Sequence, residues 1–140
     1  MAFTHQLRVR FGECDPQGIV FNAHYLAYAD IALTEFQRAA FGSYAAMIEQ
    51  HGVDLVVAEA RLRYRAPARF DDLVDITLTL GDLTGKAAAI GFTMTREAAV
   101  LVDGELQYVF VDPQTWRPQP IPDALRDSLS RLLAPAAGGS

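Results

Sequence analysis

The 140-residue chain has few of the residues that build disulfides and metal centres. Cysteine occurs once, at Cys14, so neither an intramolecular disulfide nor a cysteine-based metal cluster can form. The three histidines, His5, His24 and His51, are too scattered along the chain to argue for a metal site. We therefore expect a protein that binds no metal ion.

Long apolar runs and targeting signals are also lacking. No apolar run approaches the about 20 residues of a membrane span, and the N-terminus has neither the basic nor the apolar region of a secretion signal. These absences predict a protein that stays in the cytoplasm. The chain also lacks a glycine-rich phosphate loop and a serine nucleophile elbow, so any catalytic chemistry must come from other groups.

Basic residues are outnumbered, with 12 lysines and arginines against 17 aspartates and glutamates and a net charge of −5 at pH 7. This balance argues against general binding to nucleic acid, whose phosphates an acidic protein repels. Four basic residues nevertheless fall within nine positions, and the first three alternate as neighbours on one strand face do. Two interpretations stay open, an exposed strand face and a site for the phosphates of a nucleotide-containing substrate, for Arg61, Arg63, Arg65 and Arg69.

Hydrophobic residues make up 51% of the chain, enough for one buried core at this length. We expect a single domain over residues 1–133 and a flexible C-terminal tail over 134–140. The apolar pattern predicts a long helix from about residue 23 to 41, ended by Gly42, and shorter helices near 43–51 and 121–133. Strands are predicted at 7–11, 54–65, 73–80, 87–96 and 101–111, with turn chemistry at 81–85 and 102–105.

One strand, a long helix and four further strands predict an α+β protein. Its antiparallel five-stranded sheet should wrap around the long helix, because that helix is apolar over much of its circumference. An open sheet leaves exposed edges. We therefore expect two copies to join edge to edge in a homodimer.

One segment, Cys14 to Tyr25, combines an acid, a turn and the start of the long helix. Asp15 is its only acid, Pro16 and Gly18 shape the turn, and Asn22 is a suitable N-cap for the helix. A carboxylate beside the positive end of a helix is a place where an acyl carbonyl can be polarised and attacked. The segment therefore indicates an enzyme, although an aspartate before a proline can also serve only the turn.

The chain resembles the 4-hydroxybenzoyl-CoA thioesterase family of hotdog-fold proteins in the order of its elements and in one motif, Phe11-Gly12-Glu13-Cys14-Asp15-Pro16-Gln17-Gly18-Ile19-Val20-Phe21. The motif places an acid, a proline and a glycine ahead of an aliphatic pair and the long helix. The resemblance extends more loosely to about Asp112. It implies a hotdog fold, hydrolysis of an acyl-CoA thioester without metal or bound cofactor, and an active site at the interface of a homodimer, with dimers pairing further into a tetramer.

The resemblance also implies roles for individual residues. Asp15 is the catalytic carboxylate, acting as nucleophile or as general base toward water, and Gly18 belongs to the catalytic turn. The backbone amide of Asn22 is the donor to the oxyanion. The remaining substrate contacts are expected from Gln17, His24 and Tyr25 near the acyl group, and from Arg61, Arg63, Arg65 and Arg69 at the CoA phosphates.

Four departures or alternatives remain. The branch of the family with a catalytic-loop histidine carries it at the position of Asn22, so a histidine-assisted reaction is not expected here. Cys14 lacks the histidine and acid partners that a thiol nucleophile needs. A hotdog dehydratase would need a histidine paired with an acid across the dimer, and a non-catalytic module that binds acyl-CoA or acyl carrier protein would leave Asp15 idle.

Overall fold

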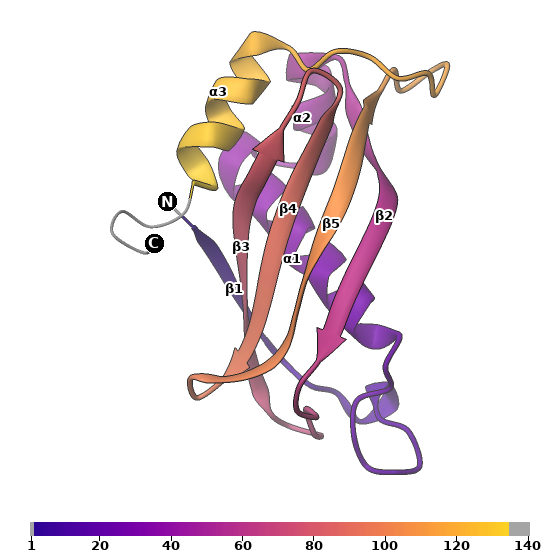
Figure 1. The fold of residues 1–140 in the computed structure, drawn as a ribbon, viewed down its shortest axis with the longest axis vertical. Coiled ribbons are helices and arrows are strands. Elements are labelled where there is room, and N and C mark those ends of the chain that lie inside the picture. The colour runs from indigo at the N-terminus through magenta and orange to yellow at the C-terminus, as the bar shows by residue number, and fades with distance from the viewer. Residues whose placement is uncertain (1, 135–140) are drawn as a thin grey trace.

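The computed structural model describes residues 2–134, and its elements follow the predicted order (Figure 1). Of the predicted tail, all but residue 134 lies outside the described residues. A short 3-10 turn, η1 (Phe11–Glu13), precedes the long helix. The strands are β1 (Phe3–Arg8), β2 (Asp54–Tyr64), β3 (Leu73–Leu83), β4 (Ala87–Arg96) and β5 (Ala99–Val111), and the helices are α1 (His24–Phe41), α2 (Tyr44–His51) and α3 (Asp123–Leu132).

The five strands form one antiparallel sheet in the order β1-β3-β4-β5-β2. This sheet curls around α1, which crosses its concave side (Figure 1). The predicted α+β architecture is therefore confirmed. Strands β1 and β2 form the two edges of the sheet.

The core lies between α1 and the concave face of the sheet. Ala29 and Ala32 of α1 are fully buried, and their small side chains let the sheet approach the helix closely. Every second residue of the central part of β3 is buried against the helix, as the period of two predicts: Val74, Ile76 and Leu78. Each such buried aliphatic side chain contributes about 1.5–3 kcal/mol to folding.

Two glycines end helices as predicted. Gly42 ends α1 with a φ of 98°, and Gly52 ends α2 with a φ of 70°, both in the region that favours glycine. The prediction that Asn22 caps α1 is wrong, because Ala23 precedes the first helical residue and no side chain caps the helix. The His24 N–H instead donates to the Phe21 carbonyl oxygen at 2.9 Å, so this donor is satisfied by the backbone.

The two predicted turns needed correction. Residues 102–105 lie inside β5, and the β4–β5 hairpin turns instead at Glu97 and Ala98, which both have positive φ (50° and 73°). Gly104 attracted the wrong prediction, because its missing side chain serves close contact between strands rather than a turn. The turn predicted at 81–85 begins later, since β3 continues to Leu83.

The first strand also lies earlier than predicted. It covers Phe3–Arg8 rather than 7–11, and Phe11 is 77% exposed in η1. The chain leaves the strand near Val9, whose N–H and carbonyl groups bond to Asp72 and Asp71 of the β2–β3 connection rather than to β3. Within residues 2–134, no helix is both long and apolar enough to cross a membrane.

Candidate active site

The segment after η1 forms a tight loop whose two sides are joined by backbone hydrogen bonds. Cys14 and Val20 make an isolated antiparallel bridge, and the Asp15 N–H donates to the Ile19 carbonyl oxygen at 2.9 Å. The Gly18 N–H closes the tip by donating to the Asp15 carbonyl oxygen at 2.9 Å. Gly18 has a φ of 81°, so the predicted need for glycine at this turn is confirmed.

The Asp15 carboxylate is held at the base of this loop. Its Oδ1 atom accepts a hydrogen bond of 2.8 Å from the Gln17 N–H, and the residue is partly buried. Within the part of the chain that the structure describes, no protein donor contacts Oδ2. One oxygen therefore orients the side chain while the other is available to water or substrate.

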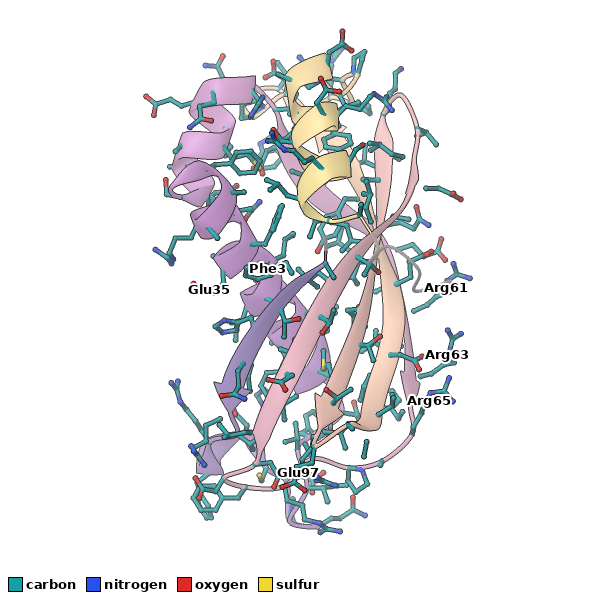
Figure 2. The ribbon with its side chains drawn as sticks, turned by 90° about the vertical axis from the view of Figure 1, so that its left-hand side faces the viewer. Phe3, Glu35, Arg61, Arg63, Arg65 and Glu97 are labelled. Carbon is teal, nitrogen blue, oxygen red and sulfur yellow. The ribbon has the colours of Figure 1, made fainter. Side chains whose placement is uncertain are left out.

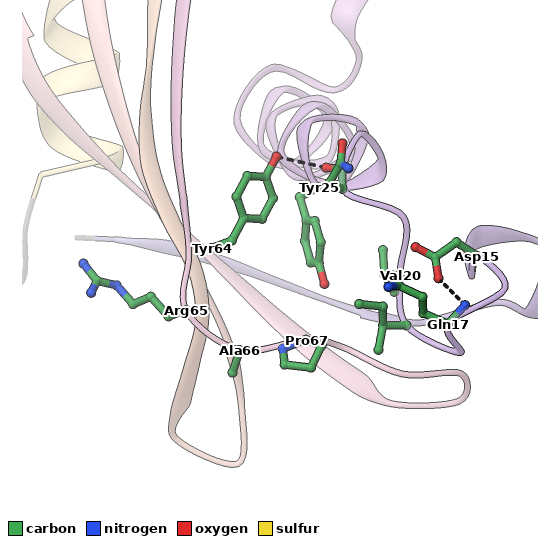
Figure 3. Close-up of a pocket in the computed structure, with 10 residues that line it drawn as sticks. Asp15, Gln17, Val20, Tyr25, Tyr64, Arg65, Ala66 and Pro67 are labelled. Atoms are coloured by element: carbon green, nitrogen blue, oxygen red, sulfur yellow. Dashed lines mark hydrogen bonds between the residues drawn. The ribbon is translucent and has the colours of Figure 1, made fainter.

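A cavity of about 340 Å³ opens beside this carboxylate (Figure 3). Asp15 and Gln17 line one side of it, and Tyr25 and Tyr64 present aromatic rings to it. Its lining brings together segments from the loop, the start of α1 and the end of β2: Asp15, Gln17, Ile19, Val20, Asn22, Tyr25, Tyr64, Arg65, Ala66 and Pro67. Five of the residues predicted from the sequence therefore line this cavity: Asp15, Gln17, Asn22, Tyr25 and Arg65. The other predicted site residues do not line it: Gly18, His24, Arg61, Arg63 and Arg69.

Two tyrosines tie the start of α1 to the end of β2 and to the connection that follows it. The Tyr64 hydroxyl donates to the Asn22 carbonyl oxygen at 3.1 Å, which fixes the peptide that leads into the helix (Figure 3). The Tyr25 hydroxyl accepts the Ala68 N–H at 3.1 Å, and burial raises the pKa of Tyr25 above its ordinary value. The Asn22 N–H donates to no acceptor among residues 2–134. A donor therefore stands free at the helix N-terminus beside the cavity.

Sequence reasoning missed Tyr64, which is 55% exposed at the end of β2. It lies 42 positions from Asn22 in the chain. No local pattern around it signals a site, because its role arises only when β2 ends next to the start of α1. Tyrosine is common in β-strands, so its presence in β2 does not by itself indicate a functional site.

His24 lies in the first turn of α1 but points elsewhere. Its ring packs edge-on against Phe21, with the ring centroids 6.3 Å apart. Contact between His24 and a substrate therefore stays a prediction. Among residues 2–134, no group of three or more histidine, cysteine, aspartate or glutamate side chains is placed to hold a metal ion.

Three arginines of the predicted cluster project from the outer side of the sheet, away from α1 (Figure 2): Arg61 and Arg63 of β2, and Arg65 directly after it. Arg61 pairs with Glu105 at 2.9 Å, and Arg63 and Arg65 pair with Asp103 at 3.0 and 2.6 Å. The Arg65 hydrogen bond, followed by that of Arg63, holds the pKa of Asp103 below its ordinary value. The side chain of Arg65 points away from the cavity, so only the rest of the residue contributes to its wall (Figure 3).

Arg69 lies further along the chain than the other three, in the connection between β2 and β3. It forms an isolated bridge with Ile19 of the loop that carries Asp15, and its N–H donates to Asp72 Oδ2 at 2.8 Å. The cluster is thus split between the outer sheet face and the loop region. Phosphate binding by any of the four arginines stays a prediction.

An antiparallel sheet curled around one long helix is the hotdog fold, which solved thioesterase structures share. Residues 9–129 match the model of the Thioesterase-like superfamily, and the chain belongs to that superfamily.

Two curated relatives and one solved structure illustrate the relationship. The chain is 30% identical over 126 residues to the acyl-CoA thioester hydrolase YbgC of Escherichia coli O6:H1, covering 88% of this chain and 92% of YbgC. It is 27% identical over 130 residues to the long-chain acyl-CoA thioesterase FadM of Escherichia coli K12, covering 91% and 97%. The structure of BH1999 gentisyl-coenzyme A thioesterase matches with a TM-score of 0.79 and 25% identity, covering 90% and 98%.

Proposed function

We propose that this protein is an acyl-CoA thioesterase of the 4-hydroxybenzoyl-CoA thioesterase type, which splits its substrate into a free acid and CoA. We include residues 1–133 in its single catalytic domain. The observation that carries the proposal is that the Asp15 carboxylate and the free start of α1 line one cavity. The names of YbgC and FadM as acyl-CoA thioesterases support CoA as the carrier.

Asp15 acts in one of two ways. As a general base it takes a proton from water, whose oxygen attacks the thioester carbonyl carbon; the C–S bond then breaks, and the CoA sulfur leaves and is protonated. As a nucleophile its carboxylate oxygen attacks the same carbon, CoA leaves, and water hydrolyses the resulting anhydride. Both routes place negative charge on the carbonyl oxygen, and the Asn22 N–H stabilises it. One such donor is worth about 100- to 1,000-fold in rate.

The acyl group that fits best is small or medium in length, aromatic groups included. The cavity is about 340 Å³ in volume, and the rings of Tyr25 and Tyr64 form flat walls beside the carboxylate. Flat aromatic walls suit a ring or a short chain. Gln17, Tyr25 and His24 are the proposed contacts near the acyl group, with the amide of Asn22 at its carbonyl.

The arginines remain the proposed contacts for the CoA phosphates. Arg61, Arg63 and Arg65 are paired with carboxylates on an exposed face, where an ion pair contributes about 0–1 kcal/mol. A phosphate can replace such a weakly held partner, because guanidinium groups bind both anions in the same bidentate geometry. Arg69 lies nearest in the fold to the catalytic loop, through its bridge with Ile19.

A panel of acyl-CoA thioesters tests the proposed function. Purified protein is offered acetyl-, octanoyl-, palmitoyl- and benzoyl-CoA, and free thiol is followed colorimetrically. We expect turnover, with a higher kcat/KM for octanoyl- or benzoyl-CoA than for palmitoyl-CoA. Absence of thiol release from every thioester would contradict the proposal. Water loss from a 3-hydroxyacyl-CoA would instead indicate a dehydratase, and binding without turnover would indicate a binding module.

We also propose that the enzyme is a homodimer joined along β2, which can pair further into a tetramer. The exposed residues of the other edge, β1, are polar, whereas β2 exposes Val57, Ala58 and Ala60 along an 11-residue edge. The same edge also exposes the charged residues Glu59, Arg61 and Arg63. A long, unpaired edge with exposed apolar residues invites pairing with a second strand. Tyr64 ends β2 at the cavity, so a partner paired along this edge would lie beside the substrate.

The dimer is tested by Val57→Asp. Val57 is 50% exposed on the β2 edge and lines a groove with Asp30 of α1. An aspartate there adds a second negative charge beside Asp30, and it also places a negative charge where the partner strand would pair. We expect the wild type to sediment at two or four times the mass of one chain and the variant to lose this association. Val100→Asp, on the interior strand β5, is the matched control and should remain dimeric. A wild-type monomer, or a dimer unaffected by Val57→Asp, argues against this interface.

A further inference from the structure

Glu13 connects the loop that carries Asp15 to the rest of the site. Its carbonyl oxygen accepts the Phe21 N–H at 3.0 Å, directly before Asn22 in the chain. Its Oε1 atom accepts two hydrogen bonds, from the Tyr28 hydroxyl at 2.7 Å and from the Arg10 N–H at 2.8 Å. One residue thus joins η1, the base of the loop and the second turn of α1.

Tyr28 is built to hold this contact. Its side chain is 1% exposed, and its ring packs edge-on against that of Tyr25 with centroids 5.9 Å apart. Burial first, and the hydrogen bond to Glu13 second, raise the pKa of Tyr28 far above its ordinary value. The phenol therefore stays protonated and donates to the carboxylate. Hydrogen bonds of this charge-assisted kind are roughly twice as strong as neutral ones.

Neither residue is among those that line the cavity beside Asp15. Any effect of the pair on catalysis must therefore pass through the residues that it holds. The loop between Glu13 and Phe21 contains both Asp15 and the turn at Gly18, and its base is joined by the Glu13–Phe21 and Cys14–Val20 pairs. The Tyr28–Glu13 hydrogen bond attaches this base to the second turn of α1, in addition to the ring contact between Phe21 and His24 in the first turn.

We propose that Glu13 and Tyr28 are a positioning pair, which holds the Asp15 carboxylate at the correct distance from the Asn22 amide. The inference rests on the proposed function, because these two groups must act on the same thioester carbon and oxygen. A displacement of about 1 Å between reacting groups costs on the order of 100-fold in rate. The pair therefore acts on kcat more than on substrate affinity.

The test compares two tyrosine–carboxylate hydrogen bonds in the same chain. Tyr28→Phe and Glu13→Ala should each lower kcat by about 10- to 100-fold, with KM changed by less than about twofold. Glu13→Gln keeps an oxygen acceptor and should recover most of the activity. The matched control is Tyr44→Phe, which removes the hydrogen bond from Tyr44 to Asp54 between α2 and β2. We expect it to lower the unfolding midpoint but leave kcat unchanged.

A double variant, Glu13→Ala with Tyr28→Phe, should lose no more activity than Glu13→Ala alone, because Glu13→Ala already removes the hydrogen bond that Tyr28→Phe removes. Unchanged kcat in Tyr28→Phe and Glu13→Ala overturns the positioning role while leaving the thioesterase proposal standing. Inactive wild-type protein overturns the thioesterase proposal instead. In that case amide hydrogen exchange tests the positioning role of the pair. Tyr28→Phe should speed exchange at residues 15–21, and Tyr44→Phe should not. Equal exchange in the two variants overturns the positioning role.

Discussion

Replacing Asp15 by asparagine should lower kcat for thioester hydrolysis by about 100- to 10,000-fold. The amide of asparagine neither takes a proton from water nor attacks a carbonyl carbon as a carboxylate does. Its side-chain oxygen can still accept the 2.8 Å hydrogen bond from the Gln17 N–H, so the loop should keep its shape. The free energy of unfolding should therefore stay within about 0.5 kcal/mol of the wild type. Thiol release and chemical unfolding measure the two effects.

Two control variants sharpen this result. Asp82→Asn removes an exposed carboxylate at the far end of β3 and should retain full activity. Cys14→Ser changes the neighbour of Asp15 and should also retain activity, because the thiol is not the proposed nucleophile. Full activity in Asp15→Asn would show that the carboxylate does not carry the reaction. If Cys14→Ser were inactive in that case, the thiol would be the nucleophile instead.

Replacing Gly104 by alanine should destabilise the fold by about 3 kcal/mol or more. Gly104 pairs with Leu62 of β2 on one side and with Phe92 of β4 on the other. A methyl group there would overlap the Arg61 carbonyl oxygen and lie 2.8 Å from the Phe92 ring. The carbonyl belongs to a strand backbone and cannot move without breaking the β2–β5 ladder. Urea unfolding of the two proteins measures the difference.

Gly85→Ala is the matched control for this change. Gly85 lies in the β3–β4 turn, and an added methyl group there has no atom within 4 Å. We expect its free energy of unfolding to differ from the wild type by less than about 0.5 kcal/mol. Equal stability of Gly104→Ala and Gly85→Ala would mean that β2 and β5 can separate locally without cost.

The local signals in the sequence were strong where one residue type meets one backbone requirement. Gly42 and Gly52 end their helices in positive φ, and Gly18 also has positive φ, at the tip of the loop that carries Asp15. The alternation of apolar residues located β3 and β4 because one face of each strand is buried. Gly104 misled the prediction, since a glycine in a strand can serve either a turn or a close approach of backbones.

The arginine cluster shows a different limit. The alternation of Arg61, Arg63 and Arg65 correctly put them on one side of the sheet, the first two within β2 and Arg65 directly after it. Their partners Asp103 and Glu105 lie about 40 positions later in the chain, on β5. Only the β2–β5 register brings these charges together, and no pattern within either segment announces the pairing.

The sequence by itself determined the loop that carries Asp15, the long helix and the succession of strands along the chain, because each depends on residues close together in the chain. The tertiary structure alone decided how Asp15 relates to Tyr64 and to the start of α1, since these segments meet only when the sheet curls around the helix. It also revealed that Glu13 and Tyr28 hold the loop against α1. Contacts of this kind depend on packing between distant segments, and the spacing of apolar residues within one segment does not predict which other segment it will contact.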